Sequence, residues 1–249
     1  MSIFDDLSSE QERLAQILSG LTDAQWLSES GAAGWTVADV VLHLAQSDEG
    51  VPVTTAGGGG PGGDSGSAGG FSRGADVDDW AAAMVSAERA APPVVFARWQ
   101  RARTAALAAL RSADPDQPLQ WVVTRMKPAT LATTRLAECW AHGLDITEPL
   151  GIDFPDTERL RNIAWLAVRT LPYALSRAGV STGPVRVSVT APDGVSEWRF
   201  GPDDAESVIS GPAGAFCRVA AQRLAPASSG LTLTGPDAAT ALSVVRTYA

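Results

Sequence analysis

The chain has 249 residues, a formal net charge of −9 and a hydrophobic content of 45%, so it can form one large domain or two modest ones with apolar cores. This acidic balance excludes a nucleic-acid-binding protein, because binding to phosphates requires clustered Lys and Arg. The absence of any run of eighteen apolar residues excludes a transmembrane helix, and the acidic N-terminus excludes a secretory signal, so we expect a cytoplasmic protein.

The first 180 residues have the apolar spacing of amphipathic helices. Apolar side chains recur every three or four residues, and Gly or Pro interrupts the pattern where helices are expected to end. Thr36 is predicted as the N-cap of the second helix, with Asp39 at its third position, and Asp156 as the cap of the last. The predicted helices cover roughly residues 3–20, 36–50, 76–90, 92–110, 128–151 and 156–179, with a short extended stretch at 119–123.

Residues 54–74 form a Gly-rich segment between two of these helices. Such a run buries too little surface to offset the entropy lost on ordering it, so we predict a mobile loop. The segment follows the helix that carries His43. It is therefore either a lid at the mouth of a pocket or an inert insertion.

After residue 180 the apolar spacing changes to every second residue, which is typical of strands. The segment 185–189 alternates valine with polar residues, and Asp193-Gly194 is a hairpin turn signal before the next strand. The sequence therefore predicts an α+β protein, with a four-helix bundle over residues 1–180 and a small α+β domain over residues 181–249. Other elements expected in the second domain are strands at 207–209 and 231–234 and helices at 212–224 and from 236.

The two histidines of the chain both lie in apolar helical stretches. Glu138 and His142 are four residues apart, which places their side chains on one face of a helix, one turn apart. His43 is on a different predicted helix, and bundles build metal sites from side chains on facing helices. Two imidazoles and a carboxylate leave coordination positions open, as in catalytic metal sites. Spacing alone leaves a second interpretation, in which each histidine is a hydrogen-bonded core residue.

Segments around these residues resemble known signatures. GWTVADVVLHLAQSDE contains His43 and RLAECWAHGLDITEPLG contains Glu138 and His142; both resemble the N-terminal domain of mycothiol-dependent maleylpyruvate isomerases, in the DinB-like metal-binding superfamily of actinobacteria. The C-terminal segments GPAGAFCRVAAQRL and LTLTGPDAATALSVV resemble a related actinobacterial metal-binding family. The resemblance implies a DinB-like bundle and a divalent metal, usually zinc, bound by His43, Glu138 and His142. Iron, nickel or manganese would also suit these ligands.

Four further residues are candidates for roles at the site. Asp48 and Asp145 follow the two histidines by five and three residues, and each is either an acceptor that orients an imidazole or an ordinary solvated acid. Arg125, just before the metal-binding helix, is either a clamp for a substrate carboxylate or a surface arginine. Arg223, in the predicted C-terminal helix, is a candidate to face the site from the second domain. We assign Asp48, Arg125 and Arg223 as the catalytic candidates.

The resemblance implies an enzyme that uses mycothiol. Metal binding lowers the pKa of a thiol, and the thiolate adds to an electrophilic carbon, which leads to cis–trans isomerisation or to S-transfer. Cys139 and Cys217 lie in apolar helical runs and are expected to be buried, which suits an external thiol. Two alternatives stay open. One is a thiol-independent metalloenzyme of secondary metabolism (isomerase, lyase, cyclase or hydrolase), and the other is a metal-binding protein without turnover. We expect a small-molecule substrate and neither nucleic acid nor membrane as a partner.

Overall fold

The computed structural model describes residues 2–58, 77–122 and 124–247 of the chain. It contains two compact units, Met1–Phe154 and Pro155–Ala249. Most of the predicted Gly-rich loop, residues 59–74, lies outside the described residues. The first unit is helical and the second combines a mixed sheet with helices, which confirms the predicted α+β fold class.

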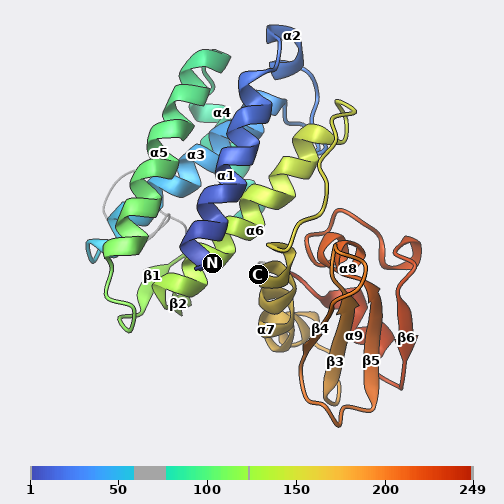
Figure 1. Cartoon of the computed structure of the whole chain (residues 1–249). Helices are drawn as coiled ribbons and strands as arrows, with labels where there is room; N and C mark the ends of the chain where they lie inside the picture. Colours follow the sequence, from blue (N-terminus) through green and yellow to red (C-terminus); the bar gives the residue numbers. More distant parts are fainter. Residues whose placement is uncertain (1, 59–76, 123, 248–249) are drawn as a thin grey trace. The chain divides into compact units, whose positions relative to one another are not determined.

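Within the described residues, four long helices build the first unit (Figure 1). α3 packs against α5 and α6, and α1 packs against the same two helices, so the four helices form a bundle around a shared core. This packing places α3 beside α6, the two helices that contain the candidate metal ligands. The long helices are α1 (Ile3–Ser19), α3 (Val37–Thr55), α5 (Pro92–Ser112) and α6 (Pro128–Thr147). The smaller elements are α2 (Asp23–Trp26), α4 (Val77–Ala87), β1 (Leu119–Trp121) and β2 (Thr124–Met126).

The start of α3 is fixed by the capping box predicted from the sequence. Thr36 Oγ1 accepts a hydrogen bond from the Asp39 amide at 3.2 Å, and Asp39 Oδ2 accepts one from the Thr36 amide at 3.0 Å. Two amides that the helix itself leaves unpaired are satisfied in this way. Arg89 pairs with the same Asp39 carboxylate at 2.8 Å. The cap sets where the helix begins, and thereby which side of it His43 occupies.

α3 continues to Thr55, beyond the predicted end near residue 50, so the first residues assigned to the Gly-rich loop are helical. Pro52 lies inside this helix, where a proline removes one backbone hydrogen bond. Tertiary contacts offset that loss: Val51 is fully buried, and Thr54 Oγ1 donates to the Gln120 carbonyl at 2.9 Å. Periodicity could not predict this last turn, because its stability depends on a strand distant in sequence.

Gly143 lies on α6 where the helix passes the ring of Phe154. A Cβ at this position would lie 2.6 Å from Phe154 Cζ, and the ring is buried, with the Arg13 guanidinium 3.5 Å from its centroid. We expect Gly143→Ala to destabilise the protein, because overpacking costs about 1–3 kcal/mol and the helix preference of alanine returns only about 1 kcal/mol. Urea unfolding measures the loss. In a Phe154→Leu background the same alanine should cost less, and an equal cost in both backgrounds would contradict the steric explanation.

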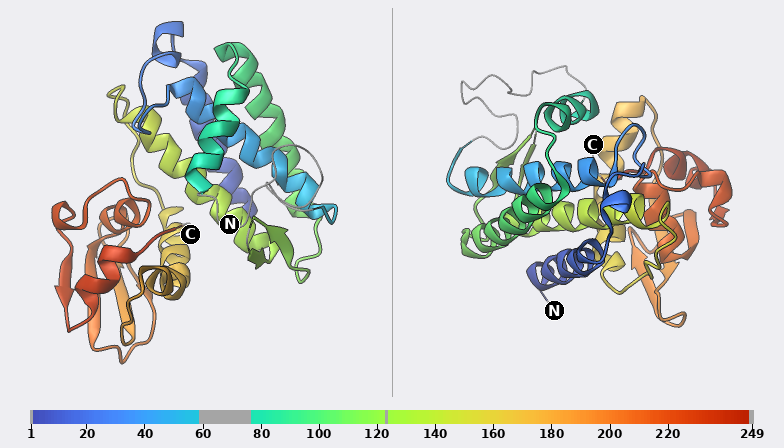
Figure 2. Two further views of the ribbon diagram at one scale, coloured as in Figure 1. Left: turned by 180° about the vertical axis from the view of Figure 1, so that it is seen from behind. Right: turned by 90° about the horizontal axis from the view of Figure 1, so that it is seen from above.

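The second unit is a four-stranded mixed sheet in the order β4-β3-β5-β6, packed against helices (Figure 2). β3 and β5 are parallel, and the other two pairs are antiparallel. Asp193 holds the turn between β3 and β4 by accepting the amides of Val195 and Ser196, which confirms the predicted hairpin. The elements are α7 (Leu160–Ala178), β3 (Val185–Thr190), β4 (Glu197–Phe200), β5 (Ser207–Pro212), α8 (Ala213–Ala220), η1 (Pro226–Ser228), β6 (Thr232–Thr234) and α9 (Ala238–Val244).

α7 belongs to this second unit, whereas the sequence placed a domain boundary near residue 180, after this helix. Its apolar stripe packs against α8 and α9, a partner choice that helical periodicity does not reveal. Two predicted ends also differ from the structure. Asp156 does not cap α7, which begins at Leu160; its carboxylate pairs with Arg218 at 2.8 Å. α8 ends at Ala220, short of the predicted residue 224.

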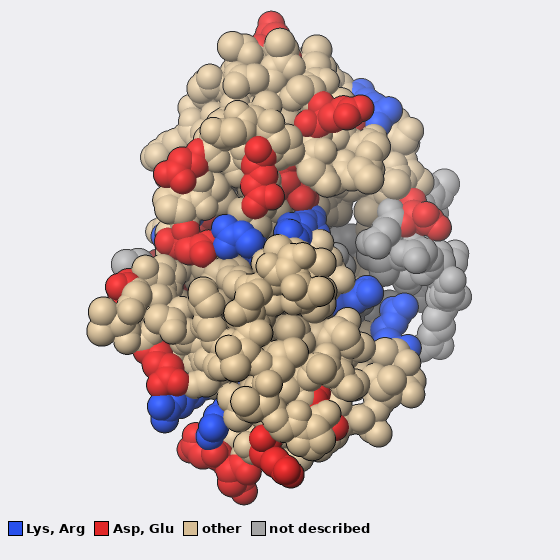
Figure 3. Space-filling view, turned by 90° about the vertical axis from the view of Figure 1, so that its right-hand side faces the viewer, with Lys and Arg blue, Asp and Glu red and all other residues tan. Residues whose placement is uncertain are grey.

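Charged side chains on the face drawn in Figure 3 occur in separate small groups, with arginines beside acids. Ion pairs that join segments of the first unit include those of Arg98 with Glu49 and with Glu88, both at 2.7 Å. Pairs of this kind leave the basic groups locally neutralised. Across the described residues, none of the helices is both long enough and apolar enough to span a bilayer.

Candidate metal centre

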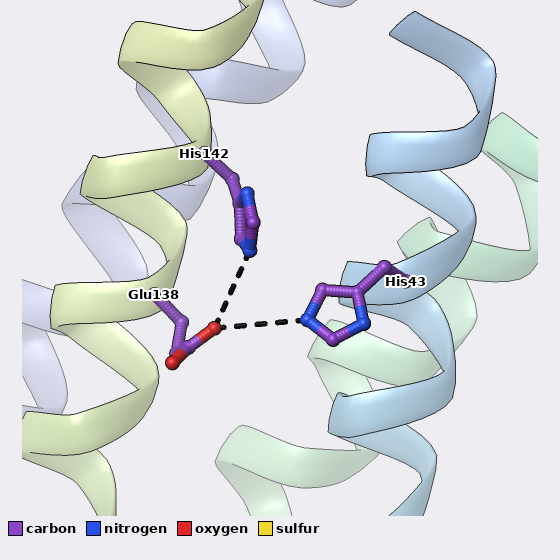
Figure 4. Close-up of side chains that lie close together, drawn as sticks. All are labelled: His43, Glu138 and His142. Atoms are coloured by element: carbon purple, nitrogen blue, oxygen red, sulfur yellow. Dashed lines mark ion pairs between the residues drawn. The ribbon is translucent and has the colours of Figure 1, made fainter. Parts of the chain in front are cut away.

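His43 on α3 faces Glu138 and His142 on α6 (Figure 4). Nε2 of His43 lies 3.7 Å from Oε2 of Glu138, and Nε2 of His142 lies 3.5 Å from the same oxygen. One ligand atom from each residue lies within 4.8 Å of the others. The three side chains singled out from the sequence therefore converge on one place between two helices.

Asp145 orients His142. Its Oδ2 lies 2.8 Å from His142 Nδ1, one turn along α6. The backbone carbonyl of Asp145 accepts the Gly31 amide at 2.7 Å, so this part of α6 is also held to the loop before α3. Because Asp145 occupies Nδ1, the Nε2 atom of His142 is left to face Glu138. Of the two roles that the sequence left open for this buried residue, its contacts are those of an orienting acceptor.

The indole of Trp35 lies against both imidazoles. Its ring centroid is 5.2 Å from that of His43 and 6.4 Å from that of His142, and the two imidazoles are 5.0 Å apart in an edge-on arrangement. Trp35 directly precedes the Thr36 cap, so the start of α3 positions this aromatic wall as well as His43. The wall limits the rotamers that the two histidines can adopt.

The environment gives the three groups different proton affinities. Burial lowers the pKa of His43, because it disfavours the charged imidazolium. Burial acts in the same direction on His142, but hydrogen bonds to Asp145 and Glu138 outweigh it and raise the pKa of this imidazole. Burial opposes ionisation of Glu138, yet hydrogen bonds with His142 and His43 hold its pKa well below the usual range. An ionised Glu138 and a neutral His43 are the states that metal coordination requires.

This donor set fits a divalent cation. Two imidazole nitrogens and one carboxylate oxygen are the protein ligands of several catalytic zinc sites, and such a set leaves a fourth position exchangeable. The same ligands accept iron, nickel or manganese, so the donor atoms do not select one metal. The centre is enclosed without being sealed, since the side chain of His43 is 17% exposed and that of Glu138 is 22% exposed.

Comparison with known proteins identifies the family. Residues 7–147, more than half of the chain, match the model of the mycothiol maleylpyruvate isomerase N-terminal domain. The chain belongs to this family. Its matched region extends from α1 to the end of α6 and so includes the three converging side chains.

Several similar proteins match nearly the whole length of this family member. Two uncharacterized proteins of Mycobacterium tuberculosis, from strains CDC 1551 / Oshkosh and ATCC 25618 / H37Rv, are each 31% identical to it over 258 residues, which is 98% of this chain and 94% of theirs. Crystal structures of a mycothiol-dependent maleylpyruvate isomerase and of a histidine-to-alanine mutant of it match with a TM-score of 0.62, at 16% and 15% identity. These two matches cover 93% of this chain and 91% of theirs, which shows a shared fold.

Asp145 offers a test of the centre that leaves all three ligands in place. We expect Asp145→Asn to weaken metal binding by about 10–100-fold, since loss of an outer-shell acceptor typically has this effect. The neutral amide accepts from an imidazole more weakly and can present its N–H₂ group to Nδ1. Calorimetric titration with zinc measures the change. Asp193→Asn, in the β3–β4 turn of the second unit, is the matched control, and equal weakening by both variants would show a general loss of folding.

Asp48 is buried and interacts with other groups. Its Oδ1 lies 3.2 Å from Nε of Arg135, and its Oδ2 accepts from Gln11 Nε2 at 3.2 Å. These hydrogen bonds are directed to Gln11 and Arg135, not to His43, so they do not support an acceptor role of Asp48 toward His43. The reason is geometric: five residues along a helix turn the side chain to a different side, while three or four residues keep it on the same one.

The two other catalytic candidates, Arg125 and Arg223, donate to backbone carbonyls of residues near them in the sequence. Arg125 is exposed on β2, and its Nη2 donates to the Pro118 carbonyl at 3.2 Å across the hairpin. Arg223 belongs to the second unit and follows the end of α8, with its Nη1 donating to the Ala221 carbonyl at 2.7 Å. A role of either guanidinium toward a substrate stays a prediction.

Arg135 was not singled out from the sequence, although it is 4% exposed and lies three residues before Glu138 on α6. The signal was available, because residues three apart share one helix face and an arginine within an apolar stripe is seldom buried without a partner. Its partner, Asp48, lies 87 residues away in sequence, so the pair could not be assigned from spacing.

Proposed function

We propose that the protein is a metal-dependent enzyme that uses mycothiol to isomerise a small electrophilic carbonyl compound or to convert it into its S-conjugate. The observation that supports this is the convergence of His43, Glu138 and His142 from two helices on one place. Three protein ligands leave room for an exchangeable group, which is the arrangement of catalytic metal sites. Membership of the family and the likeness to a mycothiol-dependent maleylpyruvate isomerase support the same class of reaction.

The chain's own residues prepare the centre for this chemistry. A divalent ion held by the three ligands would lower the pKa of an added thiol and so provide a thiolate at neutral pH. Asp145 keeps Nε2 of His142 directed toward Glu138. Burial lowers the pKa of His43 and so favours the neutral imidazole, the form that can bind a metal. Trp35 lies against both imidazoles on one side.

The sulfur nucleophile has to come from outside the chain. Cys139 and Cys217 are both buried, and burial raises the pKa of each thiol well above its ordinary value. Reactivity depends on the thiolate form, which these two side chains therefore do not reach near neutral pH. A thiol co-substrate meets this need.

The proposed reaction begins with attack of the thiolate on the β-carbon of a double bond conjugated to a carbonyl. A C–S bond forms, and the π electron pair of the double bond moves to the carbonyl oxygen. Rotation about the resulting single bond, followed by return of the electron pair and expulsion of the thiolate, gives the cis–trans isomer. Protonation of the adduct at the α-carbon gives the S-conjugate instead.

The test is turnover of cis-unsaturated keto acids by zinc-loaded protein with and without mycothiol, followed by ultraviolet absorbance and chromatography. We expect turnover that needs both metal and thiol, is lost in His43→Ala, and persists in a Cys139→Ala/Cys217→Ala variant. Turnover without thiol would overturn the proposal in favour of a thiol-independent metalloenzyme. Tight metal binding with no turnover of any tested compound would favour a non-catalytic metal protein.

A further inference from the structure

A second charged group lies beside the metal ligands. Arg135 is on α6, three residues before Glu138, and therefore on the same side of the helix, one turn away. Its Nε donates to Asp48 on α3 at 3.2 Å, so the Arg135–Asp48 pair links the two helices that also contribute the metal ligands. The side chains of Arg135 and Asp48 are 5% and 3% exposed.

The guanidinium of Arg135 is not fully used by these contacts. Its Nη2 atom is buried and has no hydrogen-bond partner among the described residues. A guanidinium has five N–H donors and stays protonated in proteins, so a buried Nη2 retains unpaired N–H groups and positive charge. Buried donors are nearly always paired with protein, water or a ligand, and an unpaired one in a native fold indicates a missing partner.

The position of Arg135 brings its charge to the metal centre. Arg135 lies one turn from Glu138 on α6, and its partner Asp48 lies on α3, the helix that carries His43. The Trp121 ring, with its centroid 5.7 Å from the guanidinium carbon, lies against the same side chain. Nε is engaged by Asp48 and the ring restricts the guanidinium, so the orientation of Nη2 is fixed before any ligand arrives.

We propose that Nη2 of Arg135 binds a carboxylate of the substrate next to the metal centre. This inference rests on the proposed function and extends it, because it makes the substrate an anion whose carboxylate is held by Arg135 while its reacting carbon lies near the metal ligands. Arginine is suited to the task, since its planar donors match the geometry of a carboxylate. Asp48 fixes the guanidinium and partly balances its charge, which limits the affinity for anions and leaves room for product release.

The test uses metal-free protein, so that a carboxylate cannot bind through a metal. Acetate is titrated at constant ionic strength against the Nε–H resonance of Arg135 in arginine-labelled protein, with acetamide as the uncharged probe of the same shape. We expect a saturable shift with acetate and none with acetamide. In Asp48→Asn, which keeps the side-chain volume and so opens no cavity for acetate, binding should become severalfold tighter because the competing carboxylate is gone.

Two variants make the result decisive. Acetate should also raise the melting temperature of the wild-type protein, because it binds the folded state. The double variant Arg135→Gln/Asp48→Asn replaces the ion pair by a neutral pair of similar shape. It should fold, as judged by circular dichroism, but acetate should no longer raise its melting temperature. Arg98→Gln, the control, removes the charge that pairs with Glu49 at the surface, and its melting temperature should still rise with acetate. A missing shift, an equal response to acetamide, or acetate stabilisation that survives in the double variant would overturn the inference. Zinc binding is measured in a separate titration. If the protein did not bind zinc, the proposed function would fail, but the acetate result on metal-free protein would still decide whether Arg135 binds a carboxylate.

Discussion

Replacing His43 with alanine is expected to abolish stable metal binding. Loss of an outer-shell partner alone weakens metal sites by about 10–100-fold, and removing one of three ligand atoms should exceed that. Glu138→Gln should have a comparable effect, because it keeps the shape of the side chain but removes the anionic oxygen that lies 3.7 Å and 3.5 Å from the two imidazoles. Metal content after dialysis, measured by elemental analysis, gives the result directly.

The same variants predict a change in stability. A metal that binds only the folded state raises the melting temperature as its concentration increases. Wild-type protein should therefore melt at a higher temperature with zinc than with a chelator, and the His43→Ala and Glu138→Gln variants should show almost no difference. Gln46→Ala is the matched control on α3, since Gln46 bonds to Met84 and Glu88 and not to the centre. Full metal occupancy in His43→Ala would show that the ligand assignment is wrong.

Much of the centre could be predicted because two of its ligands share a helix. The four-residue spacing of Glu138 and His142 fixes their common face once a helix is assumed, and Asp145 lies within the same local reach. The contribution of His43 depends on how α3 packs against α6, which periodicity does not determine. The resemblance to a known family supplied that link, and the distances between the ligand atoms agree with it.

The remaining differences arise from contacts between segments distant in sequence. Helical periodicity identified α7 but not its partners, so the domain boundary was placed after this helix, whereas it packs against α8 and α9. The last turn of α3 depends on a hydrogen bond from Thr54 to the hairpin strand β1. For Asp48 the sequence left open an acceptor role toward His43 on the same helix or a solvated surface position, while the structure buries it and pairs it with Arg135 on another helix. Local spacing predicts elements well, and it predicts partners only within one element.

The Arg135–Asp48 pair should show an asymmetric response to mutation. Removing one member of a buried ion pair costs about 3–5 kcal/mol, because the other charge stays buried without compensation. We expect Asp48→Ala to approach that loss, since a guanidinium cannot give up its proton near neutral pH. Arg135→Gln should cost less at mildly acidic pH, because a buried Asp48 can take up a proton. Burial already raises the pKa of Asp48 even with Arg135 beside it.

The pH dependence of the two losses separates these cases. In Arg135→Gln the folded-state pKa of Asp48 should rise further above the unfolded value of about 3.9. The folded state then binds more protons than the unfolded state over the interval between these two values, so the free energy of unfolding falls as pH increases through it. Relative to wild type, the deficit of Arg135→Gln should therefore grow from pH 4 to pH 7, and that of Asp48→Ala should not. Urea unfolding at several pH values measures both. A deficit of Arg135→Gln that stays constant with pH would mean that Asp48 keeps its charge without Arg135, and that water or another group, not the guanidinium, compensates it.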